Sequence, residues 1–136
     1  MILFHSETNF QLKQKAATKK WIIKTIVKEG KTAKDINFIF CDDTFLHEKN
    51  KTYLGHDTLT DIITFDYSDQ DLLSGDIFIS INRVRENASI HSTPFENELS
   101  RVIIHGVLHL LGYNDKSKKE KGIMREKEDF YLSLQT

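Results

Sequence analysis

Two histidines, His105 and His109, lie four residues apart in an apolar stretch that reads HGVLHLLGYND. Positions separated by four lie one turn apart on the same helix face, because each residue advances about 100° around the axis. Both imidazoles would therefore point in the same direction, which is half of a metal site. Gly112 can end this helix in a left-handed cap, and the chain would then turn back so that Asp115 reaches the last helical turn.

The combination of His105, His109 and Asp115 predicts a metal centre. Two neutral histidines and one carboxylate suit Zn²⁺ in an open catalytic site, where water fills the fourth position. The same ligands suit manganese, nickel or ferrous iron, because affinity and geometry separate these metals better than ligand type does. We expect one Zn²⁺ per chain, with another divalent transition metal as the alternative. The competing interpretation is an ordinary histidine pair, either on the surface or satisfied in the core.

The helix that would carry both histidines is predicted to be buried and central. Apolar side chains cover well over half of its circumference at the helical period. They are Phe95, Leu99, Val102, Ile103, Ile104, Val107, Leu108, Leu110 and Leu111. The narrow strip that remains contains Glu98, Arg101, His105 and His109. Because burial of unpaired imidazoles costs free energy, one polar strip on a buried helix favours the metal site over the ordinary pair.

The rest of the sequence predicts the elements that position this helix. Alternating or β-branched runs predict strands at 1–5, 36–41, 61–67 and 75–81, of which the last two should be antiparallel neighbours. Further helices are expected at 10–29, 42–50, 82–90 and 118–132. Thr93 as a capping residue, Pro94 at the first helical position and Glu96 at the third predict the start of the site helix. The expected fold class is α/β (α+β), with a mixed sheet of about four strands and about five helices.

Composition indicates one globular domain. The chain has 136 residues, 39% of them apolar and 29% charged, with no linker-like segment or internal repeat. A secretion signal and a long apolar run are both missing, so we expect a soluble, cytoplasmic protein without a membrane partner. The single cysteine, Cys41, excludes an internal disulfide and a cysteine-based zinc finger. We expect it to be a small apolar residue at a strand end.

A metal held in this way would support hydrolysis of a peptide, an ester or a phosphodiester, because a divalent cation polarises a substrate oxygen and makes water more acidic. Helical zinc peptidases place a glutamate base directly after the first histidine, and Gly106 occupies that place here. The peptidase interpretation therefore lacks its base. Gly106 would also admit a close neighbour, either a substrate backbone or simply an element packed against the helix.

Four stretches resemble the YbeY family of bacterial endoribonucleases. HGVLHLLGYND resembles the family motif HGxLHLxGYDH, and NKTYLGHDTLTDIITF resembles NxxYRxxDxPTDVLSF. GDIFIS resembles GDIxIS, and Met124 and Glu128 match MxxxE, so ordered matches extend from about residue 50 to residue 132. The resemblance implies a metal-dependent, single-strand-acting endoribonuclease of ribosomal RNA maturation and ribosome quality control. RNA and the ribosome would be its partners, and no DNA is expected.

By this resemblance the metal ligands are His105, His109 and Asp115, the last at a position where the family has a histidine. A carboxylate there adds negative charge and makes the metal a weaker Lewis acid. Asn114 replaces a family aspartate, and Leu54 replaces an arginine associated with phosphate binding or catalysis. The candidate sources of the missing positive charge are Arg83, Arg101 and Lys116. No protein base is evident, so Arg101 and Lys116 are the only catalytic candidates.

Substrate contacts are less clearly indicated, because a net charge of −1 is unlike most nucleic-acid-binding proteins. Lys116 and Lys118 follow the metal motif and would contact phosphates, unless they belong to a solvated face. Thr60 and Asp61 would line the cleft or else lie on the exposed side of a strand. A second lysine group marks the first helix: Lys13, Lys15, Lys19, Lys20 and Lys24.

Two functions remain open at this point. The first is the endoribonuclease. The second is a non-catalytic RNA- or ribosome-binding module with a structural metal, which would need a fourth protein ligand. That ligand would come from His5, His47, His56 or His91.

Overall fold

Four strands form a single mixed sheet in the computed structural model, which describes residues 1–55 and 60–135. They are β1 (Ile2–Ser6), β2 (Thr32–Cys41), β3 (Ile62–Asp66) and β4 (Leu72–Ser80), in the order β1-β2-β4-β3. β2 pairs in parallel with both β1 and β4, whereas β3 and β4 are antiparallel neighbours, as predicted. Alternate β2 residues Ile36, Phe38 and Phe40 are buried, as the two-residue period of a strand requires.

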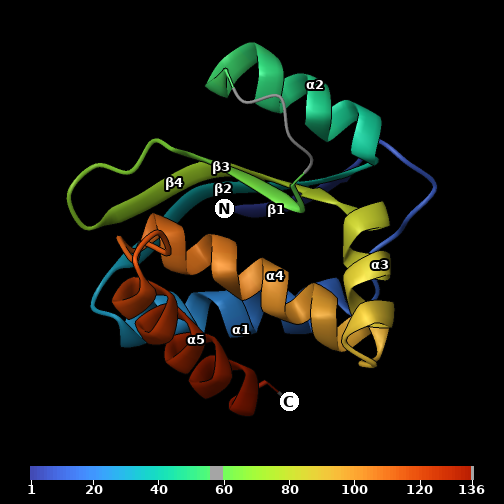
Figure 1. Ribbon diagram of the computed structural model, residues 1–136. Helices are drawn as coiled ribbons and strands as arrows, with labels where there is room; N and C mark the ends of the chain where they lie inside the picture. The colour runs from blue at the N-terminus through green and yellow to red at the C-terminus, as the bar shows by residue number, and fades with distance from the viewer. Residues whose placement is uncertain (56–59, 136) are drawn as a thin grey trace.

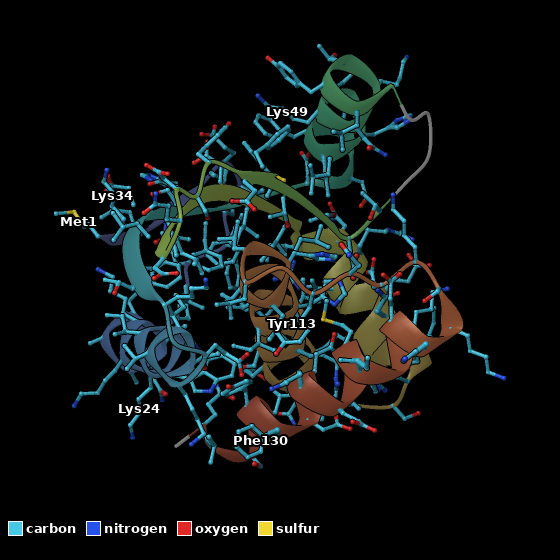
Figure 2. All side chains as sticks on the ribbon, turned by 90° about the vertical axis from the view of Figure 1, so that its left-hand side faces the viewer. Met1, Lys24, Lys34, Lys49, Tyr113 and Phe130 are labelled. Carbon is cyan, nitrogen blue, oxygen red and sulfur yellow. The ribbon has the colours of Figure 1, made fainter. Side chains whose placement is uncertain are left out.

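Five helices pack on this sheet in the described ranges: α1 (Lys15–Lys28), α2 (Asp43–Leu54), α3 (Ile81–Ile90), α4 (Phe95–Leu110) and α5 (Lys118–Ser133). Figure 1 shows α1, α4 and α5 below the sheet, α2 above it and α3 at one end. Side chains fill the space between these layers (Figure 2). The main core lies between the sheet and the lower helices, and α2 covers a smaller cluster of Cys41, Leu46 and Ile63. The α/β class predicted from the sequence is confirmed.

Helix α4 is the buried central helix that the apolar pattern predicts. It packs against β3, β4, α1, α3 and α5, and most of its apolar side chains are buried. Its C-terminus also follows the prediction: Gly112 has φ +102°, and its N–H bonds to the His109 carbonyl while the Tyr113 N–H bonds to the Leu108 carbonyl. This pair of hydrogen bonds is the Schellman motif, which reverses the chain after the helix.

The start of α4 differs from the prediction. Pro94, with φ −61° and ψ 146°, is the extended residue that precedes the helix, and Phe95 is the first helical residue. No side chain caps this end, so the capping role predicted for Thr93 is wrong. Proline restricts its predecessor to extended backbone, and here Pro94 is extended as well, which moves the start by one residue.

Other boundaries shift for reasons of tertiary packing. The first helix starts at Lys15 rather than near Phe10, after Gln14 in a left-handed conformation (φ 56°). Phe10 instead forms T-shaped ring contacts with Phe40 and Phe95. The strands β2 and β4 begin earlier than predicted, at Thr32 and Leu72, because they pair with each other along these extensions. Helix α2 continues to Leu54, four residues beyond the prediction.

Gly106 lies where α4 packs closely against the sheet. A Cβ atom at this position would lie 2.9 Å from Ile77 Cγ2 and 3.0 Å from Ile62 Cδ1. The close neighbours of Gly106 are therefore side chains of β4 and β3, which accounts for this glycine by helix–sheet packing.

Cys41 is buried at the end of β2, as expected, and its thiol donates to the Ile79 carbonyl. Burial, together with the negative charges of Asp42 and Asp43, raises the pKa of this thiol to about 12. None of the helices in residues 1–55 and 60–135 is long and apolar enough to cross a membrane.

Candidate metal centre

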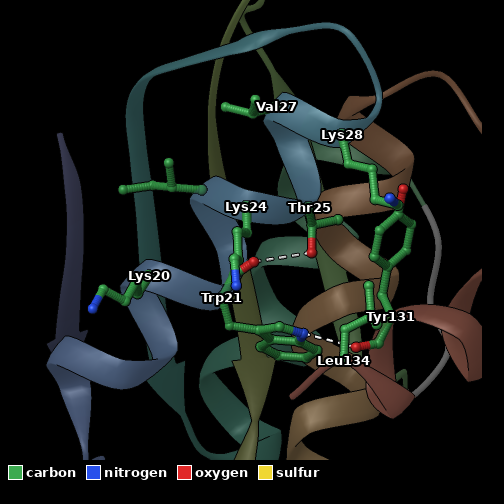
Figure 3. A pocket seen from close by; sticks show the side chains of 9 residues that line it. Lys20, Trp21, Lys24, Thr25, Val27, Lys28, Tyr131 and Leu134 are labelled. Atoms are coloured by element: carbon green, nitrogen blue, oxygen red, sulfur yellow. Dashed lines mark hydrogen bonds between the residues drawn. The ribbon is translucent and has the colours of Figure 1, made fainter. Parts of the chain in front are cut away.

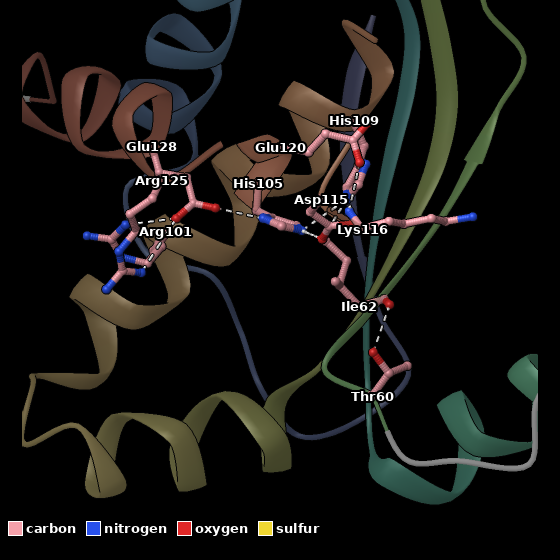
Figure 4. A network of polar contacts seen from close by, with 10 residues as sticks. All are labelled: Thr60, Ile62, Arg101, His105, His109, Asp115, Lys116, Glu120, Arg125 and Glu128. Atoms are coloured by element: carbon pink, nitrogen blue, oxygen red, sulfur yellow. Dashed lines mark hydrogen bonds and ion pairs between the residues drawn. The ribbon is translucent and has the colours of Figure 1, made fainter. Parts of the chain in front are cut away.

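Three side chains meet beside the C-terminal half of α4. His105 and His109 come from consecutive turns of the helix, and Asp115 returns to them after the turn at Gly112. The Nε2 atoms of the two histidines are 3.0 Å apart. Asp115 Oδ2 lies 3.1 Å from His105 Nε2 and 3.4 Å from His109 Nε2. The local geometry predicted from the spacing is thus present, as Figure 4 shows.

The spacing of these three atoms fits a shared metal ion. Ligand atoms bound tetrahedrally to zinc at about 2.0–2.1 Å are about 3.3 Å from one another, which matches the observed triangle. The cluster of His105, His109 and Asp115 is the one group of three or more potential ligands found among the described residues. All three side chains are half-buried, so each of them is partly accessible to solvent.

Glu128 of α5 sets the orientation of His105. The Nδ1–H of His105 donates to Glu128 Oε2 at 2.7 Å, so in the neutral ring the lone pair is on Nε2, the nitrogen that faces Asp115. Arg101 donates to the other oxygen of Glu128 at 2.8 Å and to Asp129 at 2.7 Å. A carboxylate behind a ligating histidine holds the ring and its tautomer in the state that metal binding needs.

The charges around the cluster favour a cation. Burial lowers the pKa of His105, but the hydrogen bond to Glu128 and the charges of Glu128, Asp115 and Asp61 outweigh burial and raise it above its usual value. Burial and the neighbouring His105 lower the pKa of His109, although Asp115 opposes this shift. This shift favours the neutral form of His109, which has a lone pair for a metal ion. Either a proton on His105 or a metal ion would balance the surrounding carboxylates.

Two further contacts hold the segment that carries Asp115. On one side, the Tyr113 hydroxyl donates to Glu29 Oε1 at 2.6 Å, and Glu29 also accepts from Tyr131 and Lys127. On the other side, Ser117 and Glu120 form a reciprocal capping box at the start of α5. The four-residue segment between Gly112 and Ser117 is thereby tied at both ends, which limits the positions that Asp115 can take.

Sequence reasoning missed the partners of the three candidate ligands. Glu128 belongs to the MxxxE match, but nothing in its local sequence indicates a contact with a histidine 23 residues away. No local sequence pattern indicates the contacts that Glu29 makes. The Ser117–Glu120 pair could have been found, because serine followed by glutamate three residues later is a capping pattern.

The predicted substrate residues lie at the edges of the cluster. Thr60 precedes β3, and its hydroxyl donates to the Ile62 carbonyl at 3.3 Å (Figure 4). Asp61 interacts electrostatically with His105, and burial raises its pKa. Lys116 and Lys118 are exposed immediately beyond Asp115.

The arginines proposed as sources of positive charge are already paired. Arg101 is bound by Glu128 and Asp129, as described above, and Arg83 pairs with Asp43 and Glu86. Leu54 is exposed at the end of α2. Among the three candidates, Lys116 is the one whose side chain has no carboxylate partner within the described residues.

The histidines considered as a fourth ligand do not join the cluster within the described residues. His5 bonds to Asn37, and His91 pairs with Glu98 at 3.8 Å. His47 lies on α2, above the sheet. His56 lies outside the residues that the structure describes.

Comparison with known proteins gives consistent matches over nearly the whole chain. The family model described as "Endoribonuclease YbeY" matches residues 2–135. Proteins named Endoribonuclease YbeY from Flavobacterium psychrophilum and Flavobacterium johnsoniae are 52% and 51% identical over 134 residues, which is 98% of this chain and 96% of each relative. The solution structure of a Thermotoga maritima protein is similar with a TM-score of 0.69 and 31% identity, covering 98% of this chain and 87% of that one.

Proposed function

Because the chain belongs to the endoribonuclease YbeY family, we propose that it hydrolyses phosphodiester bonds of single-stranded RNA at the cluster of His105, His109 and Asp115. The observation that carries this assignment is the convergence of three donor atoms within 3.0–3.4 Å of one another. Family membership supports the reaction class, and the geometry supports its location. The same membership favours an enzyme over the non-catalytic module.

Zn²⁺ is the proposed ion, one per chain. A divalent cation held by these side chains supplies positive charge that polarises a phosphate oxygen and makes a water molecule more acidic. Two neutral histidines and one carboxylate suit zinc, and the three ligands leave a position open for substrate or water. Manganese, nickel and ferrous iron remain the alternatives to be tested.

The protein residues have three proposed tasks. His105 and His109 present their Nε2 lone pairs, and Glu128 keeps His105 in the required tautomer. Thr60 and Asp61 would position the RNA strand along the start of β3. Lys116 and Lys118 would contact its phosphates, since phosphate contacts position a nucleic acid without reading its sequence. With Arg101 paired to two carboxylates, we assign it to the support of Glu128.

Ribosomal RNA in the cytoplasm is the proposed substrate, and the ribosome is the proposed partner. The 2′-hydroxyl and the exposed bases of single strands distinguish such RNA from duplex DNA. Cleavage should therefore be absent on a DNA oligonucleotide of the same sequence.

The test combines metal analysis with cleavage. Untagged protein purified without chelator or added metal should contain about one metal ion per chain by mass spectrometry, as a single three-ligand site requires. His109→Ala and Asp115→Ala should lose the metal and the cleavage of single-stranded RNA while keeping the fold. A variant that cleaves RNA normally without metal would disprove the proposed site. Protein that unfolds when its metal is removed would favour a structural ion.

A further inference from the structure

A groove lies between α1 and the C-terminal part of α5, on a surface that the metal cluster does not use. Its volume is about 550 Å³, and Trp21, Thr25 and Tyr131 form its floor (Figure 3). None of the three proposed metal ligands lines it. Lys24, which lines the groove, lies in Figure 2 at the opposite end of the molecule from Lys49 on α2.

The walls of the groove expose large aliphatic side chains. Ile23, Val27 and Leu134 are 45%, 61% and 44% exposed. The polar groups of the floor are already satisfied, because the Trp21 indole donates to the Tyr131 carbonyl at 2.8 Å and the Thr25 hydroxyl donates to the Trp21 carbonyl. These polar groups of the floor are therefore not free to bind a polar ligand, and the groove offers mainly apolar surface. Hydrophobic patches of this kind commonly mark interaction sites.

The rim of the groove is positively charged. Lys20, Lys24 and Lys28 line it, and no carboxylate does among the residues that the structure describes. Helix α1 contains five lysines and no acidic residue, although the whole chain has a net charge of −1. A matching ligand must combine apolar groups with negative charge.

A protein side chain fits this surface better than a nucleobase. Bases bind single-strand sites by stacking on aromatic faces, but Trp21 and Tyr131 are only 5% and 1% exposed. The exposed groups are aliphatic and recur at positions 23 and 27, one helical turn apart. Grooves with this spacing accept the apolar face of an amphipathic helix.

We propose that the α1–α5 groove docks an acidic amphipathic helix of a partner protein. Apolar side chains of that helix fill the space between Ile23, Val27 and Leu134, and its carboxylates pair with Lys20, Lys24 and Lys28. The groove and the metal cluster share no residue, so docking need not displace the proposed ligands. The docking surface does not depend on the proposed chemistry of the cluster.

The test uses a synthetic peptide and the only tryptophan of the chain. The peptide has about 18 residues, with leucines three and four apart on one face and glutamates elsewhere. Its binding to the metal-loaded protein should change the emission of Trp21 and raise the fluorescence anisotropy of a labelled peptide. The same peptide with glutamines in place of the glutamates should bind at least about tenfold more weakly.

Substitutions in the groove test whether the peptide binds there. Val27→Glu, and separately Lys24→Glu with Lys28→Glu, should each weaken binding at least about tenfold. The matched control, Lys119→Glu with Lys121→Glu, makes the same charge change on α5 outside the groove and should bind as the wild type does. All of the changed side chains are exposed, so folding should be retained; circular dichroism and metal content verify this.

Three results would overturn the proposal. The first is a peptide that produces no change in Trp21 emission or anisotropy. The second is equal binding by the groove variants and the control. The third is a single-stranded RNA oligonucleotide or an anionic phosphatidylserine vesicle that binds through Val27 and the lysines while the peptide does not.

Discussion

Both ring nitrogens of His105 make contacts. The geometry of the cluster therefore depends on residues other than the three proposed ligands. Nδ1 is held by Glu128, whereas Nε2 faces Asp115 and His109. Glu128 is itself nearly buried, and its charge is balanced by Arg101. Burial raises the pKa of Glu128, but the hydrogen bonds from His105 and Arg101 outweigh burial and lower it. A neutral side chain at this position could not satisfy both neighbours.

Glu128→Gln should lower zinc affinity by about 10- to 100-fold, because the amide loses the charge that orients His105 and balances Arg101. Competition with a chromophoric chelator measures the affinity. Asp129→Asn is the matched control: it removes the other carboxylate bound by Arg101 but touches no proposed ligand, so the affinity should hardly change. An equal loss of zinc affinity in both variants would show that the ion pairs of Arg101, and not the contact of Glu128 with His105, determine the affinity.

Asp115 can be tested by replacement with the histidine of the family pattern. Asp115→Ala removes a proposed ligand and should lower zinc affinity by more than the roughly hundredfold upper range for a supporting residue. Asp115→His should restore most of the affinity, since an imidazole can also bind the ion. Competition with a chromophoric chelator measures the zinc affinity of both variants. Equal affinity of Asp115→Ala and wild type would exclude Asp115 from the site.

At the scale of elements, the position of α4 depends on its close approach to the sheet. The neighbours of Gly106 are the branched side chains of Ile77 and Ile62, and Ile77 is fully buried. A methyl group added there must displace the helix or these side chains. Any such displacement would also move His105, the adjacent residue.

Gly106→Ala should therefore reduce the free energy of unfolding by about 1 kcal/mol, as an overpacking cost of about 1–3 kcal/mol exceeds the helical preference for alanine. Urea denaturation measures this. Gly122→Ala on α5 is the matched control, because a Cβ there meets nothing within 4 Å. It should increase stability by up to about 1 kcal/mol. Changes of the same sign in both variants would contradict the packing argument.

At the scale of the whole molecule, Glu29 connects distant parts of the chain. Its carboxylate at the end of α1 accepts hydrogen bonds from Tyr113, Lys127 and Tyr131. The groove floor at Tyr131 and the segment that carries Asp115 thus share one half-buried anion. Burial raises the pKa of Glu29, but the hydrogen bonds from the two tyrosines and Lys127 outweigh it and lower the pKa below its ordinary value.

This lowered pKa predicts a contribution to acid sensitivity. The stabilisation is fully present above the unfolded-state pKa of a glutamate, about 4.3, and is lost as the pH falls through the lower folded-state pKa. Glu29→Gln should be less stable than wild type by about 1–3 kcal/mol at pH 7. The difference should shrink as the pH falls below about 4. Urea denaturation across this range measures it, and a constant difference would contradict the assigned pKa.

Local patterns were sufficient for the elements and for the three proposed ligands. The spacing of His105 and His109 and the turn at Gly112 depend on helix geometry over eleven consecutive residues, so they could be read from the sequence. The strands and helices followed from periodicity in the same way. Two local predictions were wrong. Phe10 fits a helical pattern, but it packs against Phe40 and Phe95 before the helix begins. Thr93 fits a capping pattern, but the extended backbone of Pro94 moves the start of the helix to Phe95.

The amino-acid sequence by itself therefore determined the fold class and the residues that converge beside α4. Only the tertiary structure decided the strand order, the contact of Glu128 with His105, the shared anion Glu29 and the α1–α5 groove. Each of these joins segments far apart in the chain, such as Trp21 and Tyr131, which are 110 residues apart. Helical and strand periods describe neighbours along one element, whereas contacts between elements depend on how their buried faces pack together.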